Sequence, residues 1–159
     1  MIFNFEANAD ISKWQVVNDG VMGGRSQSAF YLNDAGHGVF EGTVSLENNG
    51  GFASVRHRFD AIVNKDCQYV AIRLKGDGKR YQFRVKSTLD QRHSYIAYVE
   101  TSGAWQTIIL PLQNLYPAFR GQKLALPNFD GKNLSEIAFL IGNKNAEAFH
   151  LEMDWIRLQ

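Results

Sequence analysis

Apolar and polar residues alternate at a period of two along most of this chain, and pairs of glycine, asparagine or aspartate interrupt the alternation. Successive side chains of a β-strand point to opposite faces, so this pattern is typical of half-buried antiparallel strands joined by tight turns. Stretches at the helical period are scarce. We therefore predict an all-β antiparallel sandwich or jelly roll with roughly ten strands, at residues 2–5, 14–17, 28–32, 39–46, 52–59, 69–75, 81–86, 95–101, 105–110, 137–141 and 149–158.

Two turn signals predict hairpins within this arrangement. The run Asn48-Asn49-Gly50-Gly51 follows the alternating segment 39–46 and supplies residues that tolerate positive φ. The run Gly76-Asp77-Gly78 separates segments 69–75 and 81–86 in the same way. Between residues 111 and 130, Pro117, Gly121 and Pro127 break the pattern, so we expect a long connection with one short helical turn around residues 112–115.

The bulk composition fits one globular domain over residues 1–159. Hydrophobic residues make up 45% of the chain and charged residues 21%, which is ordinary globular usage and enough to bury one core. The formal net charge is only +1, so we expect no nucleic acid partner and no attraction to anionic lipid. The single cysteine, Cys67, cannot form an internal disulfide, and the four histidines lack ligand spacing, so we expect neither a metal nor a cofactor.

The N-terminal residues lack the basic start, the apolar stretch and the small-residue cleavage site of a secretory signal. No run approaches the roughly 20 apolar residues that a membrane-spanning helix needs. We therefore expect a cytoplasmic protein with no direct membrane insertion.

Two glycine-rich segments are candidate binding loops. Their candidate residues are Asp19, Met22, Gly23, Gly24 and Ser26 in the first, and Asn49, Gly50, Gly51 and Phe52 in the second. Glycines at such density indicate a backbone that needs unusual dihedrals or approaches another group closely. A phosphate cradle would need a following helix, whereas residues 28–32 read as a strand, so a purely structural loop remains the alternative. The asparagines could present donors and acceptors to a sugar or a peptide, or only close their own turn.

Aromatic and arginine side chains on the expected strands are the other candidates. Six aromatic residues could stack on a sugar, anchor a protein partner or belong to the core: Trp14, Tyr81, Tyr95, Tyr98, Trp105 and Trp155. Four arginines could form one polar patch or a solvated outer face: Arg56, Arg58, Arg73 and Arg84. Ser26, Ser54, His57 and Asp154 could in principle meet as a hydrolytic group, but no motif indicates it. We expect no catalytic residues and no enzyme.

The residues from Trp14 to Ser26 carry a family resemblance. The block Asp-Gly-Val-Met-Gly-Gly-Arg-Ser at 19–26 follows Trp14 and resembles the signature of the complex I intermediate-associated protein 30 family. Further matches cover nearly the whole chain, at residues 40–42, 49–56, 76–78 with Tyr81, Trp105 with 110–111, 120–121 and 149–156.

The resemblance implies a galactose-binding-like jelly roll and no catalytic constellation. Eukaryotic members of the family are assembly factors for respiratory complex I, and relatives in photosynthetic organisms are fused to dehydrogenase-like domains. The bare domain looks like a bacterial single-domain member. The function that we expect is a non-catalytic binding module, an assembly factor or chaperone whose client is an assembly intermediate of complex I or of another redox or membrane complex.

Two other functions stay open, a carbohydrate-binding module and, ranked last, an enzyme that processes a small molecule or nucleotide. Arg56, Tyr81, Arg84 and Trp105 join the two glycine-rich segments as candidate contacts. Asp19 and Arg56 could instead pair with each other to fix the glycine loop.

Overall fold

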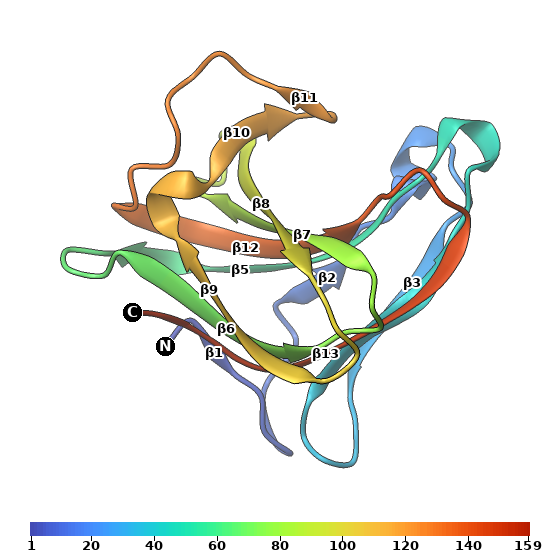
Figure 1. The fold of residues 1–159 in the computed structure, drawn as a ribbon, viewed down its shortest axis with the longest axis horizontal. Helices are drawn as coiled ribbons and strands as arrows, with labels where there is room; N and C mark the ends of the chain where they lie inside the picture. The colour runs from blue at the N-terminus through green and yellow to red at the C-terminus, as the bar shows by residue number, and fades with distance from the viewer.

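The computed structural model describes residues 1–159, apart from the side chains of Val21 and Met22. Two antiparallel sheets form the layers of a sandwich (Figure 1). The six-stranded sheet contains, in spatial order, β3 (Gln27–Leu32), β4 (Gly38–Val44), β13 (Glu147–Leu158), β6 (Tyr69–Lys75) and β9 (Trp105–Pro111), with β1 (Phe3–Asn4) paired to β13. The seven-stranded sheet contains β11 (Gln122–Lys123), β10 (Tyr116–Phe119), β8 (Ser94–Glu100), β7 (Arg80–Lys86), β12 (Asn133–Ile141), β5 (Ala53–Val63) and β2 (Trp14–Val16). The predicted all-β sandwich is confirmed.

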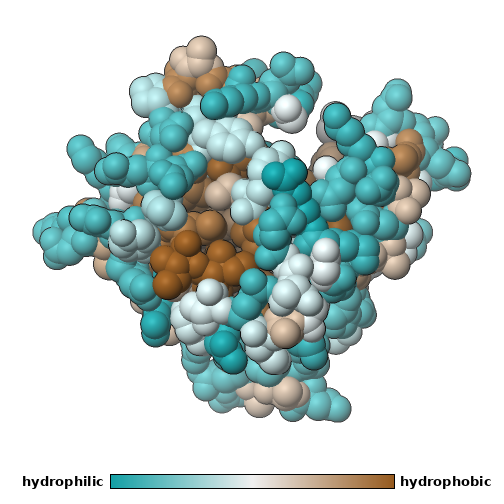
Figure 2. Space-filling view, viewed as in Figure 1, coloured by the Kyte–Doolittle hydropathy of each residue, from teal (hydrophilic) through white to brown (hydrophobic). Residues whose placement is uncertain are grey.

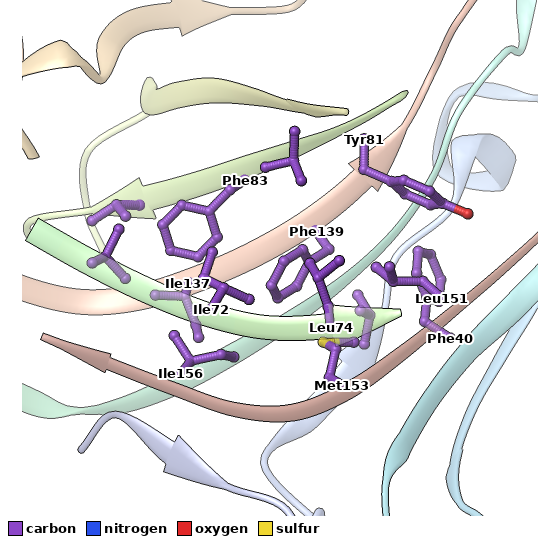
Figure 3. Close-up of a cluster of buried hydrophobic side chains, with 14 of the residues drawn as sticks. Phe40, Ile72, Leu74, Tyr81, Phe83, Ile137, Phe139, Leu151, Met153 and Ile156 are labelled. Carbon is purple, nitrogen blue, oxygen red and sulfur yellow. The ribbon is translucent and has the colours of Figure 1, made fainter. Parts of the chain in front are cut away.

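The inner faces of the two sheets form the core. Figure 3 shows Phe83, Ile137 and Phe139 of the seven-stranded sheet beside Ile72 and Ile156 of the six-stranded sheet. All five side chains are fully buried, and each such burial contributes about 1.5–3 kcal/mol. The period-two pattern therefore directs one face of every central strand inward and leaves the opposite face for polar residues.

All the expected strands are present, but both predicted hairpins are wrong. The turns at residues 48–51 and 76–78 carry the chain from one sheet to the other, because β4 and β5, like β6 and β7, lie in different sheets.

The segment from residue 111 to residue 130 also differs from the prediction. The expected helical turn is the 3-10 helix η3 (Leu112–Asn114). The rest is not a plain connection, because β10 and β11 extend the seven-stranded sheet. Pro117 lies within β10, and proline cannot donate to a strand ladder, which is why the sequence argued against a strand there. The position tolerates proline because β10 is next to the edge, with only the two-residue β11 beyond it.

An aromatic cluster closes one end of the core. The Trp14 ring stacks on His57, with centroids 4.8 Å apart, and on Phe30, with centroids 5.0 Å apart. Both Trp14 and His57 are buried, so Trp14 is not available for stacking on a ligand. Burial lowers the pKa of His57 below its ordinary value of 6.5, so the ring is neutral in the folded protein.

The buried His57 predicts a loss of stability in mild acid. Above pH 6.5 the ring is neutral in both states; below it the unfolded chain takes up a proton that the folded chain does not, so the free energy of unfolding falls. Denaturant unfolding between about pH 7.5 and about pH 5.5 should show a smaller decline for His57→Gln than for the parent chain. Equal declines would contradict the assignment.

Candidate binding face

The two glycine-rich segments meet at one carboxylate. Asp19 is 1% exposed and begins the 3-10 helix η1 (Asp19–Met22). It accepts hydrogen bonds from the Ser26 hydroxyl and from the backbone N–H groups of Ser26 (2.9 Å), Gly51 (2.8 Å) and Phe52 (3.3 Å). Burial acts to raise the pKa of Asp19, but these hydrogen bonds outweigh burial and leave the pKa below its ordinary value. We call Asp19 with Ser26, Gly51 and Phe52 the Asp19 clasp.

The clasp explains two of the glycines. A Cβ atom at Gly24 would lie 2.4 Å from Asp19 Cγ, and one at Gly50 would lie 2.6 Å from Asp19 Oδ2. Gly23 ends η1 in the left-handed region, with φ of 89°. Strand β3 follows this loop, so the segment lacks the helix that a phosphate cradle needs. Gly24 and Gly50 are therefore required for the approach of the carboxylate.

The other expected contacts are divided between several places. Asp19 and Arg56 do not pair, so that alternative is wrong: Arg56 Nη2 donates to Gln15 Oε1 on β2 at 3.0 Å. Asn49 lies exposed at the end of the 3-10 helix η2 (Glu47–Asn49). The Met22 side chain lies outside the described residues.

Tyr81 and Trp105 do not join the glycine-rich loops in one surface. Tyr81 is 1% exposed, and its hydroxyl donates to Asp77 Oδ1 at 3.0 Å. Burial and the nearby Asp77 carboxylate raise the pKa of Tyr81. Trp105 lies on β9 in the other sheet, where its ring is 4.5 Å from the His37 ring. A stacking surface of Trp14, Tyr81 and Trp105 therefore does not form.

Three of the four predicted arginines do converge, on the outer face of the seven-stranded sheet. Ala138 of β12 pairs with Arg56 of β5 on one side and with Arg84 of β7 on the other. Two residues away, Glu136 pairs with Arg58 and Lys86 in the same way. Arg73 lies on the other sheet. We call this set the arginine face: Arg56, Arg58, Arg84, Lys86, Glu136 and Ala138.

The arginine face carries four cations and one carboxylate. Glu136 is 5% exposed and accepts the Arg58 Nε–H at 2.8 Å, so its charge is already paired. Burial lowers the pKa values of Arg56, Arg84 and Lys86, and the neighbouring Arg58 charge lowers the pKa of Arg56 further. The arginine face therefore holds several positive charges close together where water is partly excluded.

Two donors on this face lack partners. The Nε atoms of Arg56 and Arg84 are buried and have no hydrogen-bond acceptor among the described residues. An unsatisfied buried donor costs about 1–3 kcal/mol, and a donor on a charged group costs more. Both Nε–H groups are also covered in the free protein, so an acceptor from outside the chain reaches them only when the side chains around them move.

Tyrosines border the arginine face on the β8 and β10 side. Tyr98 pairs with Gln82 and is 40% exposed. The Arg80 guanidinium lies over the Tyr98 ring, with its Cζ atom 3.6 Å from the ring centroid. Tyr116 pairs with Ile96, which in turn pairs with Arg84. The sequence pattern does not predict Tyr116 as a candidate, because it precedes Pro117 in a segment that is typical of a loop. In Figure 2 the upper outline is indented between the end that carries β10 and β11 and the end that carries η1 and η2.

The four residues considered for hydrolysis do not meet. Ser26 is bound to Asp19, the Ser54 hydroxyl donates to the Val17 carbonyl, and His57 lies in the aromatic cluster. Asp154 is on the six-stranded sheet, 3.5 Å from Arg73 Nε. Among the described side chains, no group of three or more His, Cys, Asp or Glu residues could hold a metal ion.

Comparison with protein families gives one clear match. A family model described as Complex I intermediate-associated protein 30 (CIA30) matches residues 3–153. The Mus musculus protein named "Complex I intermediate-associated protein 30, mitochondrial" is 21% identical over 182 residues, which cover 98% of this chain and 55% of the mouse protein. The chain thus spans about half the length of this curated relative.

Solved structures show the same sandwich. The family 11 carbohydrate-binding module of the cellulosomal cellulase Lic26A-Cel5E of Clostridium thermocellum matches with a TM-score of 0.71 and 13% identity, over 98% of this chain and 92% of the module. The Clostridium thermocellum module in complex with a beta-1,3-1,4-mixed-linked tetrasaccharide matches with a TM-score of 0.71 and 14% identity, over 98% and 93%. Within the described part of this chain, no helix is long and apolar enough to cross a membrane.

The Asp19 clasp predicts different effects for two nearby glycines. Gly24→Ala should lower the free energy of unfolding by about 1–3 kcal/mol, because the new methyl group overlaps the Asp19 side chain. Gly20→Ala is the matched control, since a Cβ there meets no atom within 4 Å. Denaturant unfolding of both variants tests this, and equal destabilisation would contradict the role of Asp19.

Proposed function

The chain belongs to the complex I intermediate-associated protein 30 family, and from this premise we propose that it is a non-catalytic binding module that holds a protein client during the assembly of a redox complex. The family model spans residues 3–153, nearly all of the chain. The mouse relative is named for an intermediate of complex I. Because the chain spans only about half of that relative, complex I as the client is itself part of the proposal.

The unpartnered arginine donors carry the proposal. Arg56 and Arg84 each hold a buried Nε–H that no described residue accepts. A client that brings acceptor oxygens to this face and shifts the two covered guanidinium groups would complete these hydrogen bonds, and bonds to charged groups contribute about 1.5–3 kcal/mol each. A face that is left unsatisfied in the free protein and is satisfied in a complex suits a reversible binder.

The glycine-rich loops have two roles in this proposal. Asp19, Gly24 and Gly50 fix the loops, because the carboxylate fills the space between the two glycines. Gly23 and Asn49 are exposed and offer backbone and carboxamide groups to the client. The loops then act as a wall beside the arginine face, at the end where η1 and η2 lie (Figure 1).

Capture of the client from the native host tests this function. The chain at natural abundance should enrich subunits of one redox complex, and Arg84→Gln should reduce their recovery about tenfold, which corresponds to about 1.4 kcal/mol. Arg157→Gln is the control, because it removes the same charge from an exposed position on the other sheet. Mass spectrometry identifies the proteins. Equal recovery by the two variants, or no enriched complex, would count against the proposal.

Carbohydrate binding is the second candidate, and the partly exposed Tyr98 ring favours it, with the Arg80 guanidinium covering one face of the ring and the other face left for a sugar. Sugars stack on such rings. Gln82 of the neighbouring strand β7 pairs with Tyr98 and adds a polar side chain beside the ring. The Clostridium thermocellum module of the same fold was solved with a mixed-linked tetrasaccharide.

Calorimetric titration with that tetrasaccharide tests the second candidate. If the sugar is the ligand, heat of binding should appear with the parent chain and disappear with Tyr98→Ala. The absence of heat at millimolar sugar, or heat that Tyr98→Ala leaves unchanged, would exclude stacking on this ring.

A further inference from the structure

We infer that the arginine face contains a slot for one carboxylate, above Ala138 and between Arg56 and Arg84, and that an Asp or Glu side chain of the client occupies it. The inference rests on the proposed function, because it names the chemical group by which the client is recognised.

The register of three strands builds the slot. Ala138 lies opposite Arg56 on one side and opposite Arg84 on the other. Neighbouring strands lie about 4.8 Å apart, so the α-carbons of the two arginines are separated by about 10 Å, with the methyl group of Ala138 between them. A longer residue at position 138 would fill the space above Ala138, between the two arginines.

Charge makes this place suitable for an anion. The nearest carboxylate on the face, Glu136, is already paired with Arg58 at 2.8 Å. Neither Arg56 nor Arg84 has an ion-pair partner within 4 Å among the described residues. Two positive charges thus flank Ala138, and Glu136, the carboxylate whose charge acts on both, is already paired with Arg58.

The Nε donors of both arginines are covered in the free protein, so a carboxylate reaches them only when the side chains around them move. Arg56 Nη2 is held by Gln15 Oε1 at 3.0 Å, and its Nε–H remains unpartnered, as does the Nε–H of Arg84. A carboxylate has two oxygens and can accept from both guanidinium groups at once. Arginine forks match this geometry better than a lysine would.

A protein carboxylate fits this face better than a polyanion does. The formal net charge of the chain is only +1, so no extended positive field would collect a row of phosphates. Ile96 and Leu140 also point to this face, and because both are buried they form an apolar floor under its longer side chains. A mixed segment with one or two acidic residues matches this chemistry.

Peptide binding to the whole chain tests the slot. The probe is a short fluorescent peptide with acetyl and amide ends and internal glutamates, compared with the same peptide in which glutamine replaces glutamate. Anisotropy should show binding of the glutamate peptide and at least tenfold weaker binding of the glutamine peptide. Ala138→Leu, which keeps every charge, and Arg84→Gln should each weaken binding of the glutamate peptide at least tenfold, whereas Arg157→Gln should not.

Further measurements distinguish a protein carboxylate from a sugar carboxylate, and they separate failure of the slot from failure of the proposed function. Binding of oligogalacturonate without binding of the peptide would overturn the assignment to a protein side chain. Equal binding of the two peptides, or full binding by an Ala138→Leu variant with an unchanged melting temperature, would overturn the slot even if the parent chain still captures its client. If Arg84→Gln loses its client but the two peptides bind equally, the slot is wrong and the proposed function is still supported.

Discussion

The buried carboxylate of Asp19 joins the two layers of the sandwich at one end. Its partners lie on both sides of the molecule, since Ser26 leads into β3 of the six-stranded sheet and Phe52 leads into β5 of the seven-stranded sheet. A buried charge is stable only when hydrogen bonds replace its hydration, and the loops supply four of them. The glycines around it follow from this requirement, because any side chain at Gly24 or Gly50 would occupy the space of the carboxylate.

The outer faces of the two sheets differ in how far their polar groups are satisfied. On the six-stranded sheet, Glu41 accepts a hydrogen bond from the Tyr31 hydroxyl at 2.7 Å, and its other oxygen lies 2.9 Å from His150 Nδ1. On the seven-stranded sheet, Arg56 and Arg84 keep unpartnered donors in a partly buried place. Folded chains normally pair such groups, and Trp14 Nε1 and His57 Nδ1 in the aromatic cluster are unpartnered as well. The two arginine donors differ in that they belong to guanidinium groups on the outer face of a sheet.

The likeness to carbohydrate-binding modules concerns the architecture. A sandwich of this kind leaves the outer face of a sheet open, and the side chains on that face decide what it binds. Here the face combines arginines and a single paired glutamate with tyrosines along one border, which suits acceptor oxygens of a protein segment or of a sugar. Family membership gives weight to the protein segment.

The sequence by itself determined most of the strands and the family, because a period of two and a glycine block are local patterns. It did not determine which strands pair, since the turns at residues 48–51 and 76–78 connect strands of different sheets. It placed Arg56, Arg58 and Arg84 among the candidates but could not say that they share a face. Only the tertiary structure decided that Arg56 and Arg84 flank Ala138, that Tyr81 is buried and that Asp19 binds Ser26 rather than Arg56. These facts depend on which distant strands pair and in what register, and pairing is fixed by the packing of the whole sandwich.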